Sequence, residues 1–212
     1  MDRDLLKMKY DIIGDVHGDY DKLIKLLEKL EYKRSNGSWD KDGHQAIFVG
    51  DLIDRGPRQI DTVALVRKMV ENGSALCILG NHEFNAIAWL TPDPNHPNAF
   101  LRAHDKPGNK MQHKAFLDEV EGKPIHHEFI EWFKTLPLWL DLGVIRIVHA
   151  CWNNGYMSQL LSDPDFHKGN TINDGLWIRS NKEGNQVFYA LEGICKGLEV
   201  ELPTGYHFLD RE

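Results

Sequence analysis

The stretch AIFVGDLIDRGP, residues 46–57, joins an unbroken apolar run to a glycine and then to charged residues. Four consecutive apolar residues, 46–49, are typical of a strand buried on both faces of a parallel sheet. Two similar transitions lie on either side, where residues 11–13 lead into Gly14 and residues 75–79 lead into Gly80. Apolar residues at helical spacing separate these strands. The alternation predicts a fold of the α/β class.

The predicted helices have recognisable ends. Asp19 is expected to cap a helix that runs to about Leu30. Pro57 should begin the next helix and Asn72-Gly73 should end it, and a third helix should begin near Glu83. Further helices are expected from about Met111 and around Phe129 to Phe133. Residues 138–142 and 144–148 predict two strands joined at Gly143.

Residues 91–113 contain four prolines, which exclude a continuous helix there. We therefore expect this segment to form a lid or insertion loop. It interrupts what is otherwise a single domain over residues 1–212, a length that one globular domain can reach.

Composition and charge narrow the class of protein. The net charge of −7 disfavours a general nucleic-acid binder or a protein that binds anionic membranes. The three cysteines form no CxxC pair, which fits a reducing compartment. We see neither a signal peptide nor an apolar run long enough to span a membrane. A cytoplasmic location is expected, whereas the oligomeric state is left open.

Each predicted strand of the parallel sheet ends in a glycine followed by polar residues. Ligands of open α/β sheets bind at the carboxyl ends of the strands, so these clusters should converge in space. A glycine at each turn would let the backbone approach a bound ion closely. The side chains concerned are those of Asp15, His17, Asp51, Asp54, Arg55, Asn81 and His82, and a fourth strand end adds His149.

The chemistry of this set is that of a metal-assisted phosphoryl site. Carboxylate, amide and imidazole groups without thiolates suit Mn, Fe or Zn. Asp51 has two oxygens and could bridge two ions, which would clamp a phosphoryl group and generate a hydroxide nucleophile. His82 could protonate the leaving group with Asp54 as its partner, and Arg55 could fork onto phosphate oxygens. Each motif alone is more often structural, so the indication of function comes from their conjunction.

The segments GDVHG (14–18), GDLIDRGP (50–57) and GNHE (80–83), with His149 after a later strand, resemble the calcineurin-like metallophosphoesterase superfamily. They are most similar to its phosphoprotein-phosphatase branch, which includes bacterial Ser/Thr phosphatases, symmetrical diadenosine tetraphosphate hydrolases and the phosphatase part of bacterial polynucleotide kinase–phosphatases. The resemblance implies a four-layer fold with two mixed β-sheets between helices. It also implies a hydrolase of phosphorylated substrates, which could be a phosphoprotein, a dinucleoside polyphosphate or a nucleotide.

By the same resemblance, two divalent ions, most often Mn²⁺, bind at the strand ends and a metal-bound hydroxide attacks the phosphorus. Asp15 and His17 would hold one ion and Asp51 would bridge. Asn81 and His149 would hold the other ion. His82 would be the general acid, Asp54 its partner and Arg55 the phosphate-binding residue.

The family closes its second metal site with a histidine in a Gly-x-His segment near the C-terminus. His167 and His207 follow His149 without that context, so we expect both to be surface or packed residues. Residues 197–206 look like a strand and a turn. Our hypothesis is a truncated form that lacks the last strands, with weakened occupancy of the second site. The alternative function is a catalytically weakened metal- or phosphate-binding fragment.

The remaining histidines and aromatic residues receive structural interpretations. His126, His127 and Glu128 are expected to face solvent. Within the lid, Arg102 is a candidate second phosphate contact. The other expectations are solvated loop positions, with access to substrate left open, for His96, His104 and His113, and core or pocket-wall positions for Trp139, Trp152, Trp177 and the packed Cys151.

Overall fold

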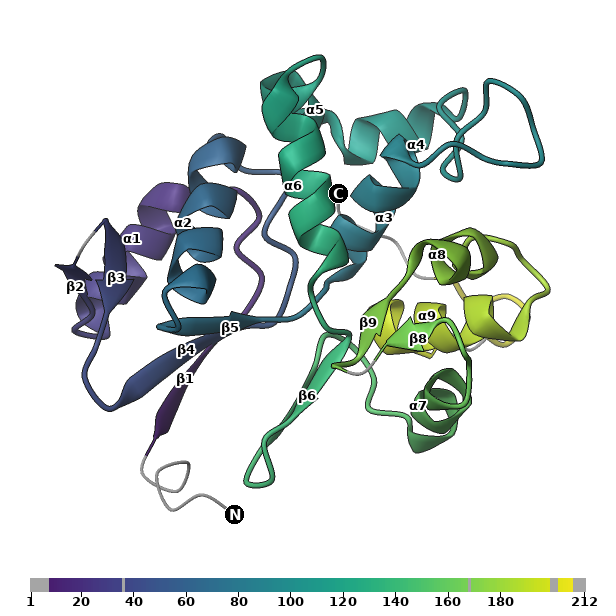
Figure 1. Ribbon diagram of the computed structural model, residues 1–212. Coiled ribbons are helices and arrows are strands. Elements are labelled where there is room, and N and C mark those ends of the chain that lie inside the picture. Colours follow the sequence, from purple (N-terminus) through teal and green to yellow (C-terminus); the bar gives the residue numbers. More distant parts are fainter. Residues whose placement is uncertain (1–7, 36, 168, 199–201, 208–212) are drawn as a thin grey trace.

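The computed structural model describes residues 8–35, 37–167, 169–198 and 202–207 (Figure 1). A parallel sheet has the strand order β1 (Lys9–Ile13), β4 (His44–Phe48) and β5 (Ala75–Cys77). The central strand β4 overlaps the predicted apolar run 46–49 but begins two residues earlier and ends one residue earlier. It pairs Ile47 with Ile12 and Phe48 with Cys77. Because β4 is covered on both faces, Ile47 and Phe48 are fully buried. The third strand ends at Cys77, two residues before its predicted end.

Helices α1 (Tyr20–Lys29) and α2 (Gln59–Glu71) cover one face of this sheet (Figure 1). Asp19 caps α1 as predicted, because its carboxylate accepts the backbone N–H of Lys22. α2 begins at Gln59 instead of Pro57, with Arg58 as its N-cap residue. It ends before Asn72-Gly73 as predicted, where Gly73 adopts a left-handed backbone with φ of 77°.

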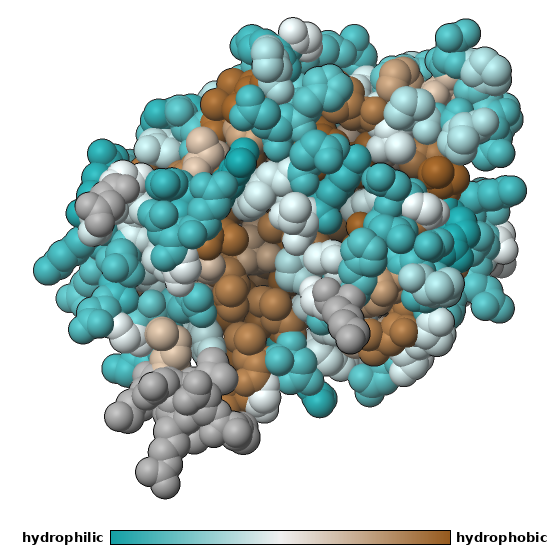
Figure 2. Space-filling view, viewed as in Figure 1, coloured by the Kyte–Doolittle hydropathy of each residue, from teal (hydrophilic) through white to brown (hydrophobic). Residues whose placement is uncertain are grey.

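A hairpin packs against the other face of the sheet. Its strands, β6 (Trp139–Asp141) and β7 (Arg146–Val148), are antiparallel, and Gly143 turns the chain between them as predicted. Ile147 of the hairpin forms a buried apolar cluster with Ile47 and Ile78. The half-buried members of this cluster contribute to the brown band that runs between β5 and β6 in Figure 2.

The fold is therefore of the α/β class. Two further antiparallel pairs are small: β2 (Lys33–Ser35) with β3 (Ser38–Asp40), and β8 (Phe166–His167) with β9 (Thr171–Ile172). Within the described residues, the β6–β7 hairpin is the part that corresponds to the second sheet implied by the family resemblance.

Four helices follow the parallel sheet along the chain. They are α3 (Asn81–Leu90), α4 (Pro107–Gln112), α5 (Lys114–Val120) and α6 (Pro124–Lys134). Only one of them, α4, falls within residues 91–113, the segment predicted to be a lid. α3 begins at Asn81 rather than near Glu83. Residues 91–106 are largely irregular as expected, and an isolated bridge pairs Pro92 with Phe100.

Two histidines expected at the surface, His113 and His126, are buried instead, whereas His104 is exposed as expected. His104 stacks between the rings of Trp89 and Phe100, with ring centroids 3.8 and 4.2 Å away. His113, between α4 and α5, is only 1% exposed. His126 is 4% exposed because it lies on the α6 face that also carries Phe129 and Phe133, one to two turns further along. The residue type suggested solvent at His113 and His126, but the neighbouring rings of Trp89 and Phe116 supply an apolar environment.

The C-terminal region contains α7 (Asn154–Leu161), α8 (Asp174–Ser180) and α9 (Gln186–Lys196), which group on one side of the molecule (Figure 1). The backbone N–H groups of Ala150 and Cys151 donate to the carbonyl of Ile194, which ties the segment after β7 to α9. Cys151 is half-buried. Trp139 and Trp177 are buried as predicted, and Trp152 is half-buried.

The strand expected within residues 197–206 has a mixed outcome. Residues 199–201 lie outside the described residues, and the described ones, 197–198 and 202–206, form no strand. As for membrane contact, we find no helix in the described part of the chain that is both long and apolar enough to cross a bilayer.

Candidate functional site

The loops that follow β1 and β4 are joined through their backbones. The N–H groups of Val16 and His17 both donate to the carbonyl of Asp51 at 2.9 Å. In return, the N–H of Gly56 donates to the carbonyl of His17 at 2.8 Å. The first two polar clusters therefore form one unit at the carboxyl ends of the strands, as the topology predicts.

Glycine is required where the second and third loops meet. A Cβ atom on Gly50 would lie 2.4 Å from the backbone nitrogen of Gly80, and one on Gly80 would lie 2.3 Å from an Asp51 carboxylate oxygen. The loops could not approach so closely with larger residues. Gly14 has open space around it and no left-handed backbone. The predicted need for glycine therefore holds at two of the three turns.

Four of the motif residues have a left-handed backbone, which side chains other than glycine rarely adopt. They are His17, Asp51, Asp54 and Arg55, with φ between 48° and 71°. Such conformations store local strain that the surrounding structure must hold in place, and they concentrate at functional sites. No feature of the sequence indicated this strain, because these residue types do not require it.

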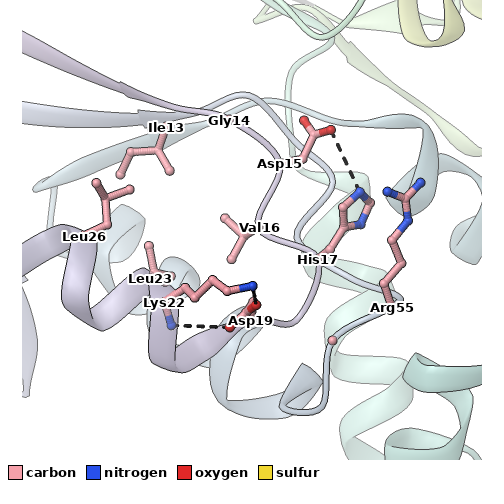
Figure 3. Close-up of a pocket in the computed structure, with 11 residues that line it drawn as sticks. Ile13, Gly14, Asp15, Val16, His17, Asp19, Lys22, Leu23, Leu26 and Arg55 are labelled. Carbon is pink, nitrogen blue, oxygen red and sulfur yellow. Dashed lines mark hydrogen bonds and ion pairs between the residues drawn. The ribbon is translucent and has the colours of Figure 1, made fainter.

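Asp51 lies at the centre of the site and is only 4% exposed. Its carboxylate oxygens lie 3.8 Å from His17 Nε2, 3.8 Å from His82 Nε2 and 3.5 Å from His149 Nε2. Asp15 approaches from the open side, with one carboxylate oxygen 3.9 Å from His17 Nε2 (Figure 3). The structure thus brings carboxylates and imidazoles from four strand ends to one place.

In His17 and His149, the hydrogen bond made by Nδ1 determines whether Nε2 can bind a cation. Nδ1 of His17 donates to the carbonyl of Ile53 at 2.8 Å, and Nδ1 of His149 donates to the carbonyl of Val49 at 2.7 Å. In a neutral ring this places the proton on Nδ1 and leaves a lone pair on Nε2. Metal-binding histidines are oriented by such contacts.

The side-chain oxygen of Asn81 is also placed where it could bind a cation. This oxygen lies 3.0 Å from His149 Nε2, although the Nδ1 proton of His149 is already donated to Val49. In the neutral ring, two lone-pair atoms then face each other across this distance. A cation between them would be bound by both. The set of oxygen and nitrogen donors fits Mn, Fe or Zn.

His82 is held differently, because its Nδ1 donates to a carboxylate oxygen of Asp54 at 2.6 Å. Burial disfavours the charged ring, but the hydrogen bond to Asp54 and the charge of Asp51 outweigh it and raise the pKa of His82. Burial also opposes ionisation of Asp54, which is fully buried, yet hydrogen bonds from His113 and His82 lower its pKa. The pair is therefore suited to holding a proton on the imidazole.

Glu83 is a structural support that the sequence analysis missed. Its carboxylate accepts the backbone N–H groups of Asp51 and Leu52, both at 2.8 Å, and of Gly80 at 3.1 Å. Complete burial, followed by the charge of Asp51, raises the pKa of Glu83 to about 7. A glutamate at the third position of a helix is typical of a capping box, and this signal could have identified it.

Glu119 of helix α5 and His113, the residue just before this helix, provide two supports that have no local sequence signal. The carboxylate of Glu119 accepts the first N–H groups of α2, from Gln59 at 2.8 Å and Ile60 at 3.0 Å. The Gln59 side chain in turn accepts the N–H of Asp54 at 2.7 Å. His113 donates to Asp54 directly at 2.7 Å. These partners are distant in sequence, so only the fold reveals them.

Arg55 separates two cavities of similar size and lines both. The first, of about 530 Å³, extends from Asp15 and His17 to the apolar side chains of α1, including Leu23 and Leu26 (Figure 3). The second, of about 540 Å³, extends from His82 to residues of α4 and α5, including Met111 and Lys114. The metal-binding geometry therefore opens to space on two sides.

The remaining predicted residues lie further from this centre. The Arg102 guanidinium donates to Asn85 at 2.9 Å and to Gln112, and burial lowers the pKa of Arg102. Arg102 does not line either cavity described above, although Gln112 lines the second. His167 and His207 are exposed, and neither joins a potential metal-binding cluster in the part of the chain that the structure describes.

Known proteins show two levels of similarity to this chain. It is 35% identical over 144 residues to the asymmetrical bis(5'-nucleosyl)-tetraphosphatase PrpE of Oceanobacillus iheyensis, covering 68% of this chain and 55% of that protein. It is 26% identical over 199 residues to the symmetrical bis(5'-nucleosyl)-tetraphosphatase of Methylobacillus flagellatus, covering 94% of this chain and 60% of that protein. The chain thus spans little more than half the length of these relatives.

A crystal structure of a metallophosphoesterase from Sphaerobacter thermophilus aligns with 63% of this chain and 43% of that chain, at 21% identity and a TM-score of 0.41. The model of the calcineurin-like phosphoesterase family matches residues 8–192. This match includes every strand of the parallel sheet and all residues gathered around Asp51. The chain belongs to the calcineurin-like phosphoesterase family.

Proposed function

We propose that this chain is a metal-dependent phosphoesterase that uses two divalent cations, most often Mn²⁺, bound around Asp51. The observation that carries this proposal is the arrangement of three imidazole Nε2 atoms within 3.5–3.8 Å of the Asp51 carboxylate. When bound, such cations would neutralise charge on phosphoryl oxygens and lower the pKa of a water molecule. Family membership supports the same reaction class.

The ligands divide into two sets that share Asp51. Asp15 and His17 would complete one set, and Asn81 and His149 would complete the other. The first set contains two carboxylates, whereas the second contains one carboxylate and a neutral amide. Because negative ligands attract a divalent cation more strongly, the first set should bind it more tightly.

The chain's own side chains would provide proton transfer and phosphate binding. His82, held by Asp54 at 2.6 Å, would donate a proton to the leaving oxygen from Nε2. Arg55 lines both cavities and would neutralise charge on the phosphoryl oxygens between them. The left-handed backbone of Asp54 and Arg55 would fix both groups before substrate binds.

We favour a dinucleoside polyphosphate over a phosphoprotein as substrate. Its two nucleosides are joined by a phosphate chain, which matches two cavities that meet at Arg55. The cavity beside α1 combines the apolar Leu23 and Leu26 with the polar Asp19 and Lys22, a lining that suits a nucleoside. The activity named for the two relatives, bis(5'-nucleosyl)-tetraphosphatase, supports this choice.

Hydrolysis assays on the purified chain test both levels of the proposal. The substrates would be p-nitrophenyl phosphate, diadenosine tetraphosphate and a phosphoserine peptide, each with and without Mn²⁺. We expect Mn²⁺-dependent turnover of the first two, and a higher kcat/KM for diadenosine tetraphosphate than for the peptide. The matched controls are Asp51→Asn at the shared ligand and Asp42→Asn in an exposed turn.

The outcomes distinguish the proposed phosphoesterase activity from the proposed substrate. Turnover that Asp51→Asn abolishes and Asp42→Asn retains would support a metal-dependent phosphoesterase. A preference for the phosphopeptide would overturn the substrate proposal alone. Absence of any Mn²⁺-dependent turnover above the Asp51→Asn background would contradict the enzyme and favour a binding fragment.

A further inference from the structure

A second imidazole shares the Asp54 carboxylate with His82. His113 lies between α4 and α5, and its Nδ1 is 2.7 Å from Asp54 Oδ2. His82 Nδ1 is 2.6 Å from the same oxygen. The two histidines are far apart in the chain, and all three side chains are buried. One carboxylate oxygen therefore connects them.

The hydrogen-bonding pattern fixes the role of each nitrogen. A carboxylate oxygen only accepts, so both Nδ1 atoms must donate. Among the described residues, Nε2 of His113 has no hydrogen-bond partner, and neither does Oδ1 of Asp54. A second N–H on His113 would thus be buried without an acceptor, which is costly. The neutral tautomer protonated at Nδ1 satisfies His113 best.

His113 also accounts for how Asp54 remains ionised in a dry environment. A buried carboxylate requires donors, and its side chain receives two, from His82 and His113. Without His113, His82 would be the single described donor to the Asp54 side chain, and His82 is the group that Asp54 has to position. The aspartate could then rotate, carrying His82 with it.

The surroundings hold His113 rigidly. Trp89 contacts its ring in an edge arrangement, with centroids 6.3 Å apart, and Trp89 is itself stacked on His104. Helix α5, which follows His113, is anchored to the start of α2 through Glu119. His113 therefore reaches Asp54 from a separate, fixed part of the fold.

We infer that His113 is a positioning residue: it orients Asp54, and through Asp54 it aims His82 Nε2 at the leaving group. Gln112 and Lys114, its neighbours in sequence, line the cavity beside His82. The part of a substrate that leaves through this cavity would thus lie against the segment that carries His113. The inference rests on the proposed phosphoesterase activity.

Two substitutions separate positioning from folding. His113→Asn keeps a side-chain N–H close to the location of Nδ1, whereas His113→Leu keeps bulk but removes the donor. Two substrates separate proton donation from the rest of catalysis. p-Nitrophenolate leaves without much help from an acid, whereas the alkoxide of glycerol phosphate requires protonation.

With glycerol phosphate, we expect His113→Leu to lower kcat by roughly tenfold to hundredfold, as displacement of a catalytic group does. With p-nitrophenyl phosphate, the same variant should lose no more than about threefold, because the acid matters little there. His113→Asn should restore most of the glycerol phosphate rate, and KM should change little throughout. Equal losses on both substrates, or no loss on either, would overturn the inference.

A measurement without turnover keeps the inference testable if the chain is inactive. Long-range ¹H–¹⁵N spectra of the metal-free chain report which ring nitrogen carries the proton. We expect His113 and His82 both to show a proton on Nδ1, and the His82 signals to shift in His113→Leu but not in His127→Asn. A proton on Nε2 of a neutral His113 would overturn the inference. Activity absent in every variant and in the parent chain would instead contradict the proposed function.

Discussion

Two pairs of histidines surround the site, and the pairs differ in the group that accepts the hydrogen bond from Nδ1. His17 and His149 donate to backbone carbonyls, of Ile53 and Val49. His82 and His113 donate to the carboxylate of Asp54. A backbone carbonyl orients a neutral ring and leaves Nε2 free to bind a cation. The Asp54 carboxylate instead favours the protonated ring of His82, while the neutral ring of His113 holds that carboxylate in place. The same side chain thus acquires two chemistries from its second contact.

Loss of His82 should give the largest effect, because no other described imidazole donates to Asp54 while facing the cation site. We expect His82→Asn to lower kcat for alkyl phosphates by about 10³-fold, within the range for general acid catalysis. Steady-state kinetics measure this, with the exposed His127→Asn as the matched control. If His82→Asn lost less than about tenfold, the carboxylate-held pair would not include the acid.

The Asp54→Asn variant tests why the second pair uses a carboxylate. Asp54 raises the pKa of His82, and an acid contributes fully below its pKa and is lost as pH rises through it. Removing the negative charge should therefore move the alkaline limb of the kcat profile to lower pH. We also expect kcat to fall about 10- to 100-fold, the usual cost of an outer-shell partner.

The pH–rate profile of Asp42→Asn provides the comparison for that experiment. Its alkaline limb should coincide with that of the parent chain, since Asp42 lies in an exposed turn. An unchanged limb in Asp54→Asn would show that Asp54 does not set the pKa of the acid.

The sequence alone predicted the central strands and the residues around Asp51. The apolar runs 46–49 and 75–79 predicted the strands that the structure places at His44–Phe48 and Ala75–Cys77, because a buried parallel strand is marked by apolar residues alone. The residues around Asp51 were found because each follows such a strand directly. Their proposed roles stay predictions until metal and activity are measured.

The features that the sequence did not predict all depend on contacts between residues far apart in the chain. His113 looks like a polar loop residue, but the fold buries it beside Trp89 and joins it to Asp54, 59 residues away. His126 was expected at the surface because of its residue type, yet Phe116 covers it. The strained backbone of His17 and Asp51 likewise depends on packing between loops rather than on residue type.

For His17 and His149, the pair held by backbone carbonyls, we predict a smaller effect, which concerns the affinity for metal. His17 belongs to the ligand set with two carboxylates and His149 to the set with one. We expect a calorimetric titration with Mn²⁺ to show two binding events whose affinities differ by about tenfold or more, as ligand charge tunes affinity. Two events of equal affinity would contradict the assigned ligand sets.

Arg102 should show the smallest effect. Its Nη1 and Nη2 atoms donate to Asn85 and Gln112, so we expect Arg102 to support the cavity wall rather than to bind phosphate. We expect Arg102→Gln to raise KM by about fivefold, the equivalent of one net hydrogen bond. A loss of kcat/KM approaching that of Arg55→Gln would place Arg102 on the phosphate, as first predicted from sequence.

The most direct test of the difference between the two pairs is metal content. Each of the variants His17→Asn, His149→Asn and His82→Asn would be equilibrated with Mn²⁺ at a concentration that saturates the parent chain, and bound manganese would be measured per chain. We predict that His17→Asn and His149→Asn each retain less manganese than the parent chain, whereas His82→Asn retains as much. Equal loss of manganese from all three variants would contradict the account, because His82 would then bind metal as the carbonyl-held histidines do.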